Sequence, residues 1–274
     1  MKALLRGRAF QLGLLLVGLV LLAALAADLL APFDPIKSNY RNRLGAPSGI
    51  NLLGTDRFGR DVLSRILHGA RVSLEIGVAV SLLSGLTGAM VGLACGWWRG
   101  IDRWLMRIMD GLMAFPGLLL AIALAATLGP SEATVIIALT VAYTPRTARV
   151  MRGAVLVARA QDYVEAARAT GARTARILRH HVLPACAAPL VVQQTYVFAI
   201  AILAEAVLSF VGVGPPPPSP TLGSIIADGR DAMVEAPWVC LAPGAAIATL
   251  VLGLNLLGDG LRDALDPRLR RILR

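Results

Sequence analysis

Long apolar segments without charged side chains constrain the fold of this sequence more than any other feature. The first of them, Ala9 to Ala27, contains 19 residues, enough for a helix to cross the roughly 30 Å hydrocarbon layer of a membrane. It exceeds the apolar core of a secretion signal, about 7–15 residues, so we interpret it as an uncleaved first transmembrane helix. With 56% hydrophobic and 16% charged residues, the chain also differs from soluble globular proteins. An all-α membrane protein is predicted.

The apolar segments predict six transmembrane helices. They lie at about residues 10–30, 73–97, 109–128, 133–151, 186–211 and 237–257. The fourth is interrupted by Pro145, and Arg146, Arg149 and Arg152 follow at helical spacing. We expect these arginines to line one face of the helix and to reach the lipid headgroups by snorkelling.

The distribution of positive charge predicts the orientation in the membrane. The chain has 27 Lys and Arg residues and a net charge of +10. If the N-terminus is inside, 19 of these residues fall in cytoplasmic segments and 8 outside, as the excess of Lys and Arg in cytoplasmic loops requires. Both termini are therefore predicted to be cytoplasmic. The charge indicates an anionic membrane surface and no nucleic-acid partner, because a soluble basic domain would not carry such long apolar runs.

The segment between the first two predicted spans has a helical pattern of its own. Leu53–Asp56 reads as a turn with a helix N-cap. The apolar residues that follow at helical spacing are Phe58, Val62, Ile66 and Leu67. This pattern predicts an amphipathic helix on the outer membrane surface. Residues 1–71 would then form the first span and an outer segment, and residues 72–274 a core of five transmembrane helices.

Small residues in the second predicted span recur four apart. They are Ser84, Gly88, Gly92, Gly96 and Gly100. On a helix they form a nearly straight groove in which another backbone can approach closely. We interpret Gly88, Gly92 and Gly96 as helix-packing residues, and contact with substrate is the alternative.

Glu205 is an ionisable residue within the fifth predicted span. A carboxylate at membrane depth is costly, so it should face protein or a water-filled path. In that interpretation Glu205 and Ser209 belong to a translocation path. The alternative places Glu205 near the outer end of the span, where it reaches water or pairs with an arginine. Beyond it, Gly212–Pro218 cannot continue a helix, and Leu222–Met233 predicts a short amphipathic helix on the outside.

An arginine-rich polar hairpin, Asp162–Pro184, separates the fourth and fifth predicted spans. Tyr163–Thr170 consists of good helix formers and predicts a short helix. Gly171 follows where a helix end favours a left-handed residue, and a second helix is expected to end at Pro184. A cytoplasmic loop would explain the arginines, but it would not explain this order of small-residue helix, glycine and proline.

The hairpin resembles the EAA loop of ABC importer permeases. Glu165–Ala167 supplies the EAA sequence, Gly171 follows after three residues, and His181–Pro184 follows after nine more. One departure is His181, because many members of the family carry an aliphatic residue there.

Two further segments resemble the permeases that import dipeptides, oligopeptides or nickel. One is LGTDRFGRDVLSRILHGARVSL, and the other is Asn255–Arg268. With the hairpin, the resemblance covers about residues 50–270. It implies the type I ABC importer permease fold, with six transmembrane helices and a cytoplasmic coupling helix.

The resemblance also implies partners and a location in the bacterial cytoplasmic membrane. In this family the hairpin docks into an ATPase subunit, and the residues that match its motif are Tyr163, Glu165, Ala166, Ala167 and Gly171. The implied partners are a homologous permease that completes a heterodimer, two cytoplasmic ATPase subunits, an extracytoplasmic solute-binding protein and membrane lipid.

Motifs for catalysis or cofactor binding are absent from the sequence. A phosphate-binding loop needs GxxxxGK[ST], but the only lysines, Lys2 and Lys37, follow Met1 and Ile36. The three cysteines and three histidines lack the spacing of a metal site. We therefore expect no catalytic residue, no metal and no bound cofactor, with ATP and Mg²⁺ used by partner subunits.

These features predict a passive conduit driven by a separate ATPase, and the resemblance of residues 129–131 and of the C-terminal motif to peptide permeases implies dipeptides or short oligopeptides as substrates. Nickel or another small solute is the alternative within the same family. A secondary transporter is the alternative from another class, and such proteins typically show inverted repeats and several intramembrane ion ligands. The sequence shows no repeat and only Glu205 as a deep ionisable group.

Overall fold

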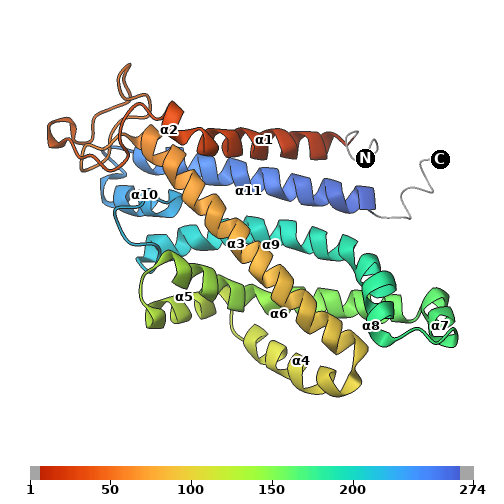
Figure 1. Ribbon diagram of the computed structural model, residues 1–274. Coiled ribbons are helices and arrows are strands. Elements are labelled where there is room, and N and C mark those ends of the chain that lie inside the picture. Colours follow the sequence, from red (N-terminus) through yellow and green to blue (C-terminus); the bar gives the residue numbers. More distant parts are fainter. Residues whose placement is uncertain (1–6, 266–274) are drawn as a thin grey trace.

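The computed structural model describes residues 7–265, and its regular structure is helical, as predicted (Figure 1). Within this range there is no β-strand, only an isolated bridge between Thr55 and Asp61. The long helices run side by side, and one of them, α3, crosses the others obliquely (Figure 1). Helix α7 projects at the end where α1 begins and α11 ends, and the long segment between α2 and α3 lies at the opposite end (Figure 1). We call these the α7 end and the loop end.

The helices follow one another along the whole described chain. They are α1 (Arg8–Leu25), α2 (Ala27–Leu30), α3 (Val62–Trp97), α4 (Arg99–Met113), α5 (Gly117–Leu128), α6 (Glu132–Arg159), α7 (Asp162–Ala169), α8 (Thr174–Ile177), α9 (Leu183–Val211), α10 (Leu222–Gly229) and α11 (Trp238–Leu265). The shorter turns are the 3₁₀ turns η2 (Tyr40–Asn42) and η4 (Arg230–Ala232), and the π-helical turn η3 (Leu178–Val182).

Helices occupy all six positions predicted for membrane spans. Four segments are long and apolar enough to cross a membrane: α1, α3, α11, and the continuous helix Thr174–Val211 that α8, η3 and α9 form. Helices α4 and α5 together would make a fifth, but they are bent by 88°. Helix α6 has 28 residues, enough to span, but it also contains four arginines. Length and apolar composition thus support four or five spans among residues 7–265 and do not confirm six.

The third predicted span, residues 109–128, is wrong as one straight helix. The chain breaks between Met113 and Gly117, because Pro116 has no backbone N–H to donate and disfavours helical backbone at Phe115. The apolar part of this predicted span forms only the 12 residues of α5. Helix α4 lies at 88° to it.

Two arginines of α6 form ion pairs with carboxylates of α4. Arg152 makes two hydrogen bonds to the carboxylate of Asp102 on α4, at 2.5 and 2.7 Å, and Arg149 makes one to Asp110, at 2.6 Å. Pro145 does not interrupt the helix, since α6 continues through it to Arg159. Arg149 and Asp110 are still 52% and 58% exposed, so the reach of these arginines to the lipid headgroups stays a prediction.

The predicted amphipathic helix on the outer surface does not form. The helix begins at Val62 with Asp61 as its N-cap, where the Asp61 side chain accepts a hydrogen bond from the Ser64 backbone N–H. It then continues without a break to Trp97. Asp56 caps no helix, because its carboxylate instead closes a turn by accepting from the backbone N–H groups of Phe58 and Arg60. The boundary expected at residues 71/72 falls inside α3.

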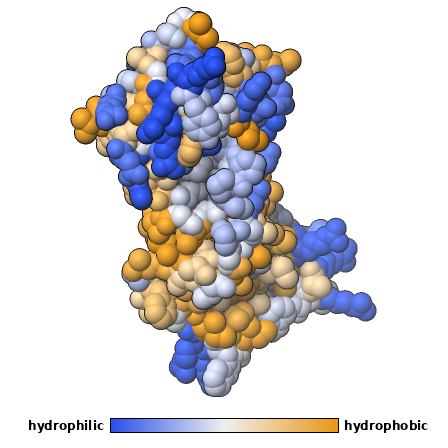
Figure 2. Space-filling model, turned by 90° about the vertical axis from the view of Figure 1, so that its left-hand side faces the viewer, coloured by the Kyte–Doolittle hydropathy of each residue, from blue (hydrophilic) through white to orange (hydrophobic). Residues whose placement is uncertain are grey.

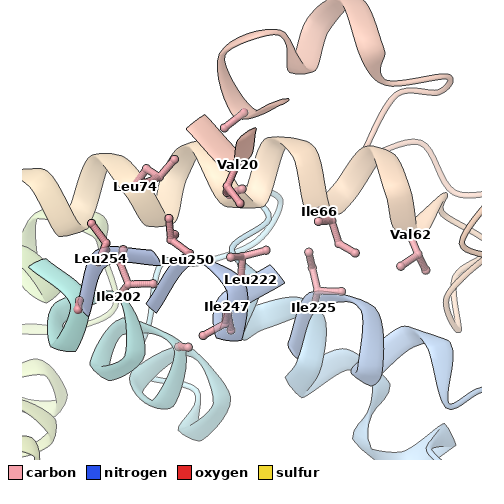
Figure 3. Packing of buried hydrophobic residues seen from close by; sticks show 14 of the residues in the cluster. Val20, Val62, Ile66, Leu74, Ile202, Leu222, Ile225, Ile247, Leu250 and Leu254 are labelled. Carbon is pink, nitrogen blue, oxygen red and sulfur yellow. The ribbon is translucent and has the colours of Figure 1, made fainter. Parts of the chain in front are cut away.

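The main core lies toward the loop end and joins helices that are distant in sequence. Side chains of α3 face those of α10 and α11, with Ile66 and Leu74 opposite Leu222, Ile225 and Leu250 (Figure 3). Helix α1 adds Val20, and α9 adds Ile202. These apolar side chains cover one another and so bury the inner face of each helix. The same contacts fix the position of α10 against the bundle.

The loop end is mostly polar where the segment before α3 covers it. Figure 2 views the molecule from that end and shows polar side chains gathered over its upper part, with hydrophobic side chains dominating below. The segment that makes this polar surface carries the ion pairs described below.

Candidate functional site

Helix α7 projects from the bundle and is held there by one buried side chain. Val164 is fully buried in a small apolar cluster that includes Val155 of α6, Ile177 of α8 and Val182 of η3. Ala167 packs against the same cluster. Because the contacts are few and apolar, the outer face of α7 stays open.

The end of α7 is fixed by backbone hydrogen bonds around Gly171. The N–H of Ala172 donates to the carbonyl of Ala167 at 3.0 Å, and the N–H of Gly171 donates to the carbonyl of Arg168 at 2.9 Å. Gly171 has a φ of +78°. This pair of bonds with a left-handed glycine is a Schellman motif, so the predicted role of Gly171 in ending the helix is confirmed.

The residues predicted to couple to an ATPase lie mostly on the exposed face of this hairpin. Tyr163, Glu165, Ala166 and Gly171 are exposed, whereas Ala167 is partly buried against the cluster below. The Tyr163 ring lies 6.1 Å from the ring of His181, centroid to centroid. The hairpin thus presents one carboxylate, one aromatic ring and small side chains to its surroundings.

A strongly basic cavity of about 740 Å³ lies between α7 and the ends of α3, α4 and α6. Its ionisable residues are Arg99, Asp102, Arg103, Arg152, Arg159, Glu165 and Arg168. The guanidinium of Arg168 lies 4.8 Å from the centroid of the Trp97 ring, and Arg159 donates to the Trp97 carbonyl at 2.9 Å. The sequence analysis missed this link between the hairpin and α3, because its signal is only a tryptophan at a helix end.

The second half of the hairpin does not end at Pro184, contrary to the prediction. Helix α8 runs through the π-helical turn η3 directly into α9, and Pro184 lies in the first turn of α9. Proline lacks an N–H and crowds the preceding turn, and a π turn is a common way to accommodate such a mismatch inside a helix. The hairpin is therefore rigidly continuous with α9.

The spaced glycines of α3 lie against α6. A Cβ atom added to Gly88 would lie 2.6 Å from Cβ of Thr147, and one added to Gly92 would lie 2.5 Å from the carbonyl oxygen of Ala148. Gly96 is similarly close to Val155. Gly100 belongs to α4 and has no such neighbour. The close approach of α3 to α6 thus depends on missing side chains at three of these positions.

Glu205 is fully buried and hydrogen-bonded to hydroxyl groups. Ser73 of α3 donates to its Oε2 at 2.8 Å, and Ser209, one turn further along α9, donates to its Oε1 at 2.6 Å. Thr221, just before α10, donates to Ser209 at 3.2 Å. Among residues 7–265, Glu205 is 0% exposed and forms no ion pair with an arginine. The carboxylate instead joins α3, α9 and α10.

At the loop end, ion pairs tie the segment before α3 to α10. Arg65 donates to Asp56 at 2.7 Å and to Asp228 at 3.0 Å, and Arg60 donates to the same two carboxylates at 2.7 and 2.8 Å. The side chains of Asp56 and Arg65 are 0% and 3% exposed. The sequence analysis missed this network, since the six helices α4 to α9 separate Arg65 from Asp228 along the chain.

A second, exposed ion pair at this end joins α2 to α3. Arg71 donates to Oδ2 of Asp28 at 2.9 Å. That hydrogen bond, with a smaller contribution from His68, lowers the pKa of Asp28 below its ordinary value. The pair connects the end of the first span to the second.

Residues 7–265 contain no group of three or more His, Cys, Asp or Glu side chains arranged to hold a metal ion. Cys95, Cys186 and Cys240 are buried and unpaired by disulfides. The chemistry that the described surface offers is charge, hydrogen bonding and shape.

Comparisons with known proteins agree with this arrangement. Residues 85–271 match the family described as binding-protein-dependent transport system inner membrane component. The chain is 53% identical over 269 residues to a Brucella suis protein whose name describes a peptide transport system permease, covering 98% of this chain and 91% of that protein. It is 44% identical over 265 residues to the di/tripeptide transport system permease protein DppC of Pseudomonas aeruginosa, covering 94% and 88%.

The fold is also shared with a solved structure. The MetNI methionine ABC transporter in an inward-facing conformation contains a chain that aligns with a TM-score of 0.62. The alignment covers 73% of this chain and 96% of that chain at 21% identity. With the family match, which spans more than half of the sequence, these findings show that the chain belongs to the binding-protein-dependent transport system inner membrane components, the multi-pass permeases of ABC importers.

Proposed function

We propose that the chain is the transmembrane subunit of an importer that uses ATP to bring dipeptides or short oligopeptides into the cytoplasm. The names of the Brucella and Pseudomonas relatives, which describe peptide and di/tripeptide transport, support this substrate class. The observation that carries the proposal is helix α7, which projects from the bundle with an open outer face and a fixed end. A projecting, rigid helix suits a role in which another protein moves it.

In this proposal α7 is the coupling helix and docks into a groove of an ATPase subunit. Glu165 and Tyr163 offer a charge and an aromatic ring to that groove, and the small side chain of Ala166 lets the partner surface come close. Ala167 and Gly171 keep the helix seated and correctly ended. The partner ATPases bind ATP and Mg²⁺, and this chain binds neither.

The complete importer contains further partners in this proposal. A homologous permease completes a heterodimer, two ATPase subunits lie in the cytoplasm, and a solute-binding protein delivers the peptide from outside. The distribution of Lys and Arg supports a cytoplasmic α7 end and cytoplasmic termini. Lys2, Arg6 and the basic residues after Leu265, which contribute to that count, lie outside the described residues.

Motion of α7 would reach the spans through the cluster around Val164. That cluster contains residues of α6 and of the helix that continues into α9. Closure of the ATPases around ATP would move α7, tilt α6 and α9, and open the path outward to receive peptide. Release of the ATPase products would reverse the motion and open the path inward.

At the loop end, Ser209 lines a cavity of about 420 Å³ that also involves Arg60 and residues 215–218. We propose that this cavity is the outer mouth of the path. Glu205, held by Ser73 and Ser209, would then support its wall from inside the chain.

Replacing Gly171 tests the coupling role. Gly171→Val puts a β-branched residue at a φ of +78°, which costs about 1–2 kcal/mol for ordinary residues and more for branched ones. We expect peptide uptake by the reconstituted complex to fall about tenfold while the ATPase subunits remain bound and hydrolyse ATP. Gly171→Asn is the matched control, because asparagine tolerates left-handed backbone. Full uptake by the valine variant would contradict the coupling role.

Substrate class is tested separately with the same proteoliposomes. Radiolabelled dipeptide, nickel ion and free amino acid are offered with and without ATP, in the presence of the cognate solute-binding protein. We expect uptake of dipeptide that depends on ATP. Uptake of nickel and not of dipeptide would show that the substrate is a metal ion. Uptake without the ATPase subunits would identify a secondary transporter.

A further inference from the structure

A polar cavity lies on the side of α9 that faces away from α3. Its volume is about 580 Å³, within the usual range for small-molecule sites. Helices α6, α9 and α11 line it, and its polar side chains are Arg146, Gln193, Thr195, Tyr196, Asn255, Asp259 and Arg262.

The helical period separates the two faces of α9. Gln194, Phe198 and Ile202 lie against α3, as the contacts to Ser81 and Gly77 show. Val192, Gln193 and Tyr196 line the cavity, and on a helix of 3.6 residues per turn they point to the opposite side. The cavity is therefore on the face that α3 does not cover.

The position of Arg146 along α6 argues against lipid as the surroundings of this cavity. Arg146 lies about midway along α6, and Asn255 lies in the second half of α11, which is one of the apolar spans. Charged side chains at such depth are costly in hydrocarbon, and they normally face protein or a water-filled path. The cavity is thus an internal surface of the working importer.

The charged residues of the cavity are not neutralised by one another. Arg146 donates to the Tyr196 hydroxyl at 3.2 Å, and its guanidinium lies 4.4 Å from the centroid of that ring, but it contacts no carboxylate. In the part of the chain between residues 7 and 265, Asp259 and Arg262 form no ion pair either.

An uncharged polar group in the cavity is also left without a partner. The side-chain amide nitrogen of Gln193 is buried and donates no hydrogen bond within the described residues. A buried donor without an acceptor is costly, and Gln193 lines the cavity, so a turn of its side chain toward the cavity would let an entering acceptor satisfy this amide. A peptide carbonyl is such an acceptor.

We infer that this cavity is the inner part of the translocation path and that it recognises the two charged ends of a peptide. Arg146 binds the C-terminal carboxylate and Asp259 binds the N-terminal ammonium, while Gln193 donates to a peptide carbonyl. The inference rests on the proposed function for its substrate class. It adds which residues of this chain read that substrate, and by which chemical groups.

End-blocked dipeptides test this recognition. The assay uses the complete complex in proteoliposomes, with dialanine, its C-terminal amide and its N-acetyl derivative as substrates at saturating concentrations of binding protein. For the unmodified complex we expect uptake of dialanine to exceed that of each blocked form by at least about tenfold, the effect of losing a hydrogen bond to a charged group.

Single substitutions then separate the two ends. In Arg146→Gln, dialanine uptake should fall about tenfold to the level of the amide, with discrimination against the N-acetyl form retained. In Asp259→Asn the pattern should be reversed. Arg149→Gln is the matched control, because Arg149 lies on the same helix, pairs with Asp110 and does not line the cavity. Arg146→Lys keeps the charge and serves if the glutamine variant fails to assemble.

The outcomes distinguish the inference from the proposed function. If the unmodified complex transports no peptide with ATP, the proposed function fails and the inference fails with it. If it transports peptides but Arg146→Gln lowers uptake of free and blocked forms equally, the inference alone is overturned. Loss of the partner permease from both Arg146 variants would show that the cavity is a subunit interface, and it would also overturn the inference.

Discussion

The two ends of the bundle are built on different principles. At the loop end, Asp56, Arg60, Arg65 and Asp228 satisfy one another's charges inside the chain. At the α7 end, a buried valine, a hydrogen-bonded glycine turn and the stacking of Arg168 on Trp97 hold a helix whose carboxylates form no ion pair within the described residues.

The difference shows which charged groups are paired within this chain and which surface is open to a partner protein. Removing one member of a network of buried, paired charges destabilises the folded state strongly, because the remaining charges lose their partners. A helix seated by a few apolar contacts can open locally at lower free energy than the whole fold. The loop end should therefore control stability, and the α7 end should control motion and transport.

Breaking the charge network at the loop end should have the largest effect on stability. Asp56→Asn leaves Arg65 buried with less compensating charge, and we expect the free energy of unfolding to fall by about 3–5 kcal/mol. Thermal unfolding in detergent, followed by loss of helical circular dichroism, measures this. Asp231→Asn is the control, since Asp231 is 70% exposed and should change stability by less than about 0.5 kcal/mol. Equal effects would mean that the network does not determine stability.

Widening the contact between α3 and α6 should have the next largest effect, because these helices connect the two ends. Gly92→Ala introduces a Cβ only 2.5 Å from the Ala148 carbonyl oxygen, and overpacking of this kind costs about 1–3 kcal/mol. Gly153→Ala, on α6 with nothing within 4 Å, should leave stability unchanged or raise it slightly. A matching loss in both variants would indicate a general effect of glycine replacement.

Weakening the seat of α7 should separate local from global stability. Val164→Ala removes two buried methyl groups, worth about 1.5 kcal/mol. We expect amide hydrogen exchange in residues 162–170 to accelerate about tenfold, with little change in the melting temperature of the bundle. Val157→Ala, on the exposed face of α6, should alter neither quantity. A large drop in melting temperature for Val164→Ala would remove the distinction between the two ends.

The exposed pair at the loop end should have the smallest effect. The lowered pKa of Asp28 means that its carboxylate stabilises the folded state above its unfolded pKa, and that this contribution disappears as the pH falls through the lower folded pKa. Asp28→Asn should melt slightly below the wild type at pH 7, and the difference should begin to shrink below about pH 4 and vanish once the pH is below the lowered pKa of folded Asp28. A difference that persists in acid would have to come from helix capping or packing.

Local signals explain which features the sequence could predict. The left-handed backbone at Gly171 and the helix before it depend on neighbouring residues, so pattern alone placed them. The positions of the long helices followed from apolar runs for the same reason. The role of Asp56 depends on Asp228, which no local pattern connects to it, and the sequence therefore suggested a helix cap.

Other differences arose where contacts with distant residues changed the outcome that the local sequence predicts, at prolines that usually end a helix and at arginines in an apolar segment. Pro145 and Pro184 stay inside continuous helices, although proline alone predicts an end. Arg149 and Arg152 find carboxylates on α4 because the chain bends sharply before α5, a direction that hydropathy does not encode. The cavity beside α9 could not be seen either, since its polar residues come from three helices.

The π turn at Leu178–Val182 gives the orientation of the hairpin an unusual dependence on chain length. Such a turn holds an additional residue compared with regular α-helix, and each residue of an α-helix advances the chain by about 100° and 1.5 Å. Because the wider turn takes up the additional residue, deleting one residue there would restore a regular helix and rotate α7 only slightly about the axis of α9. Deleting one residue from the regular part of α9 would instead rotate α7 by about 100°.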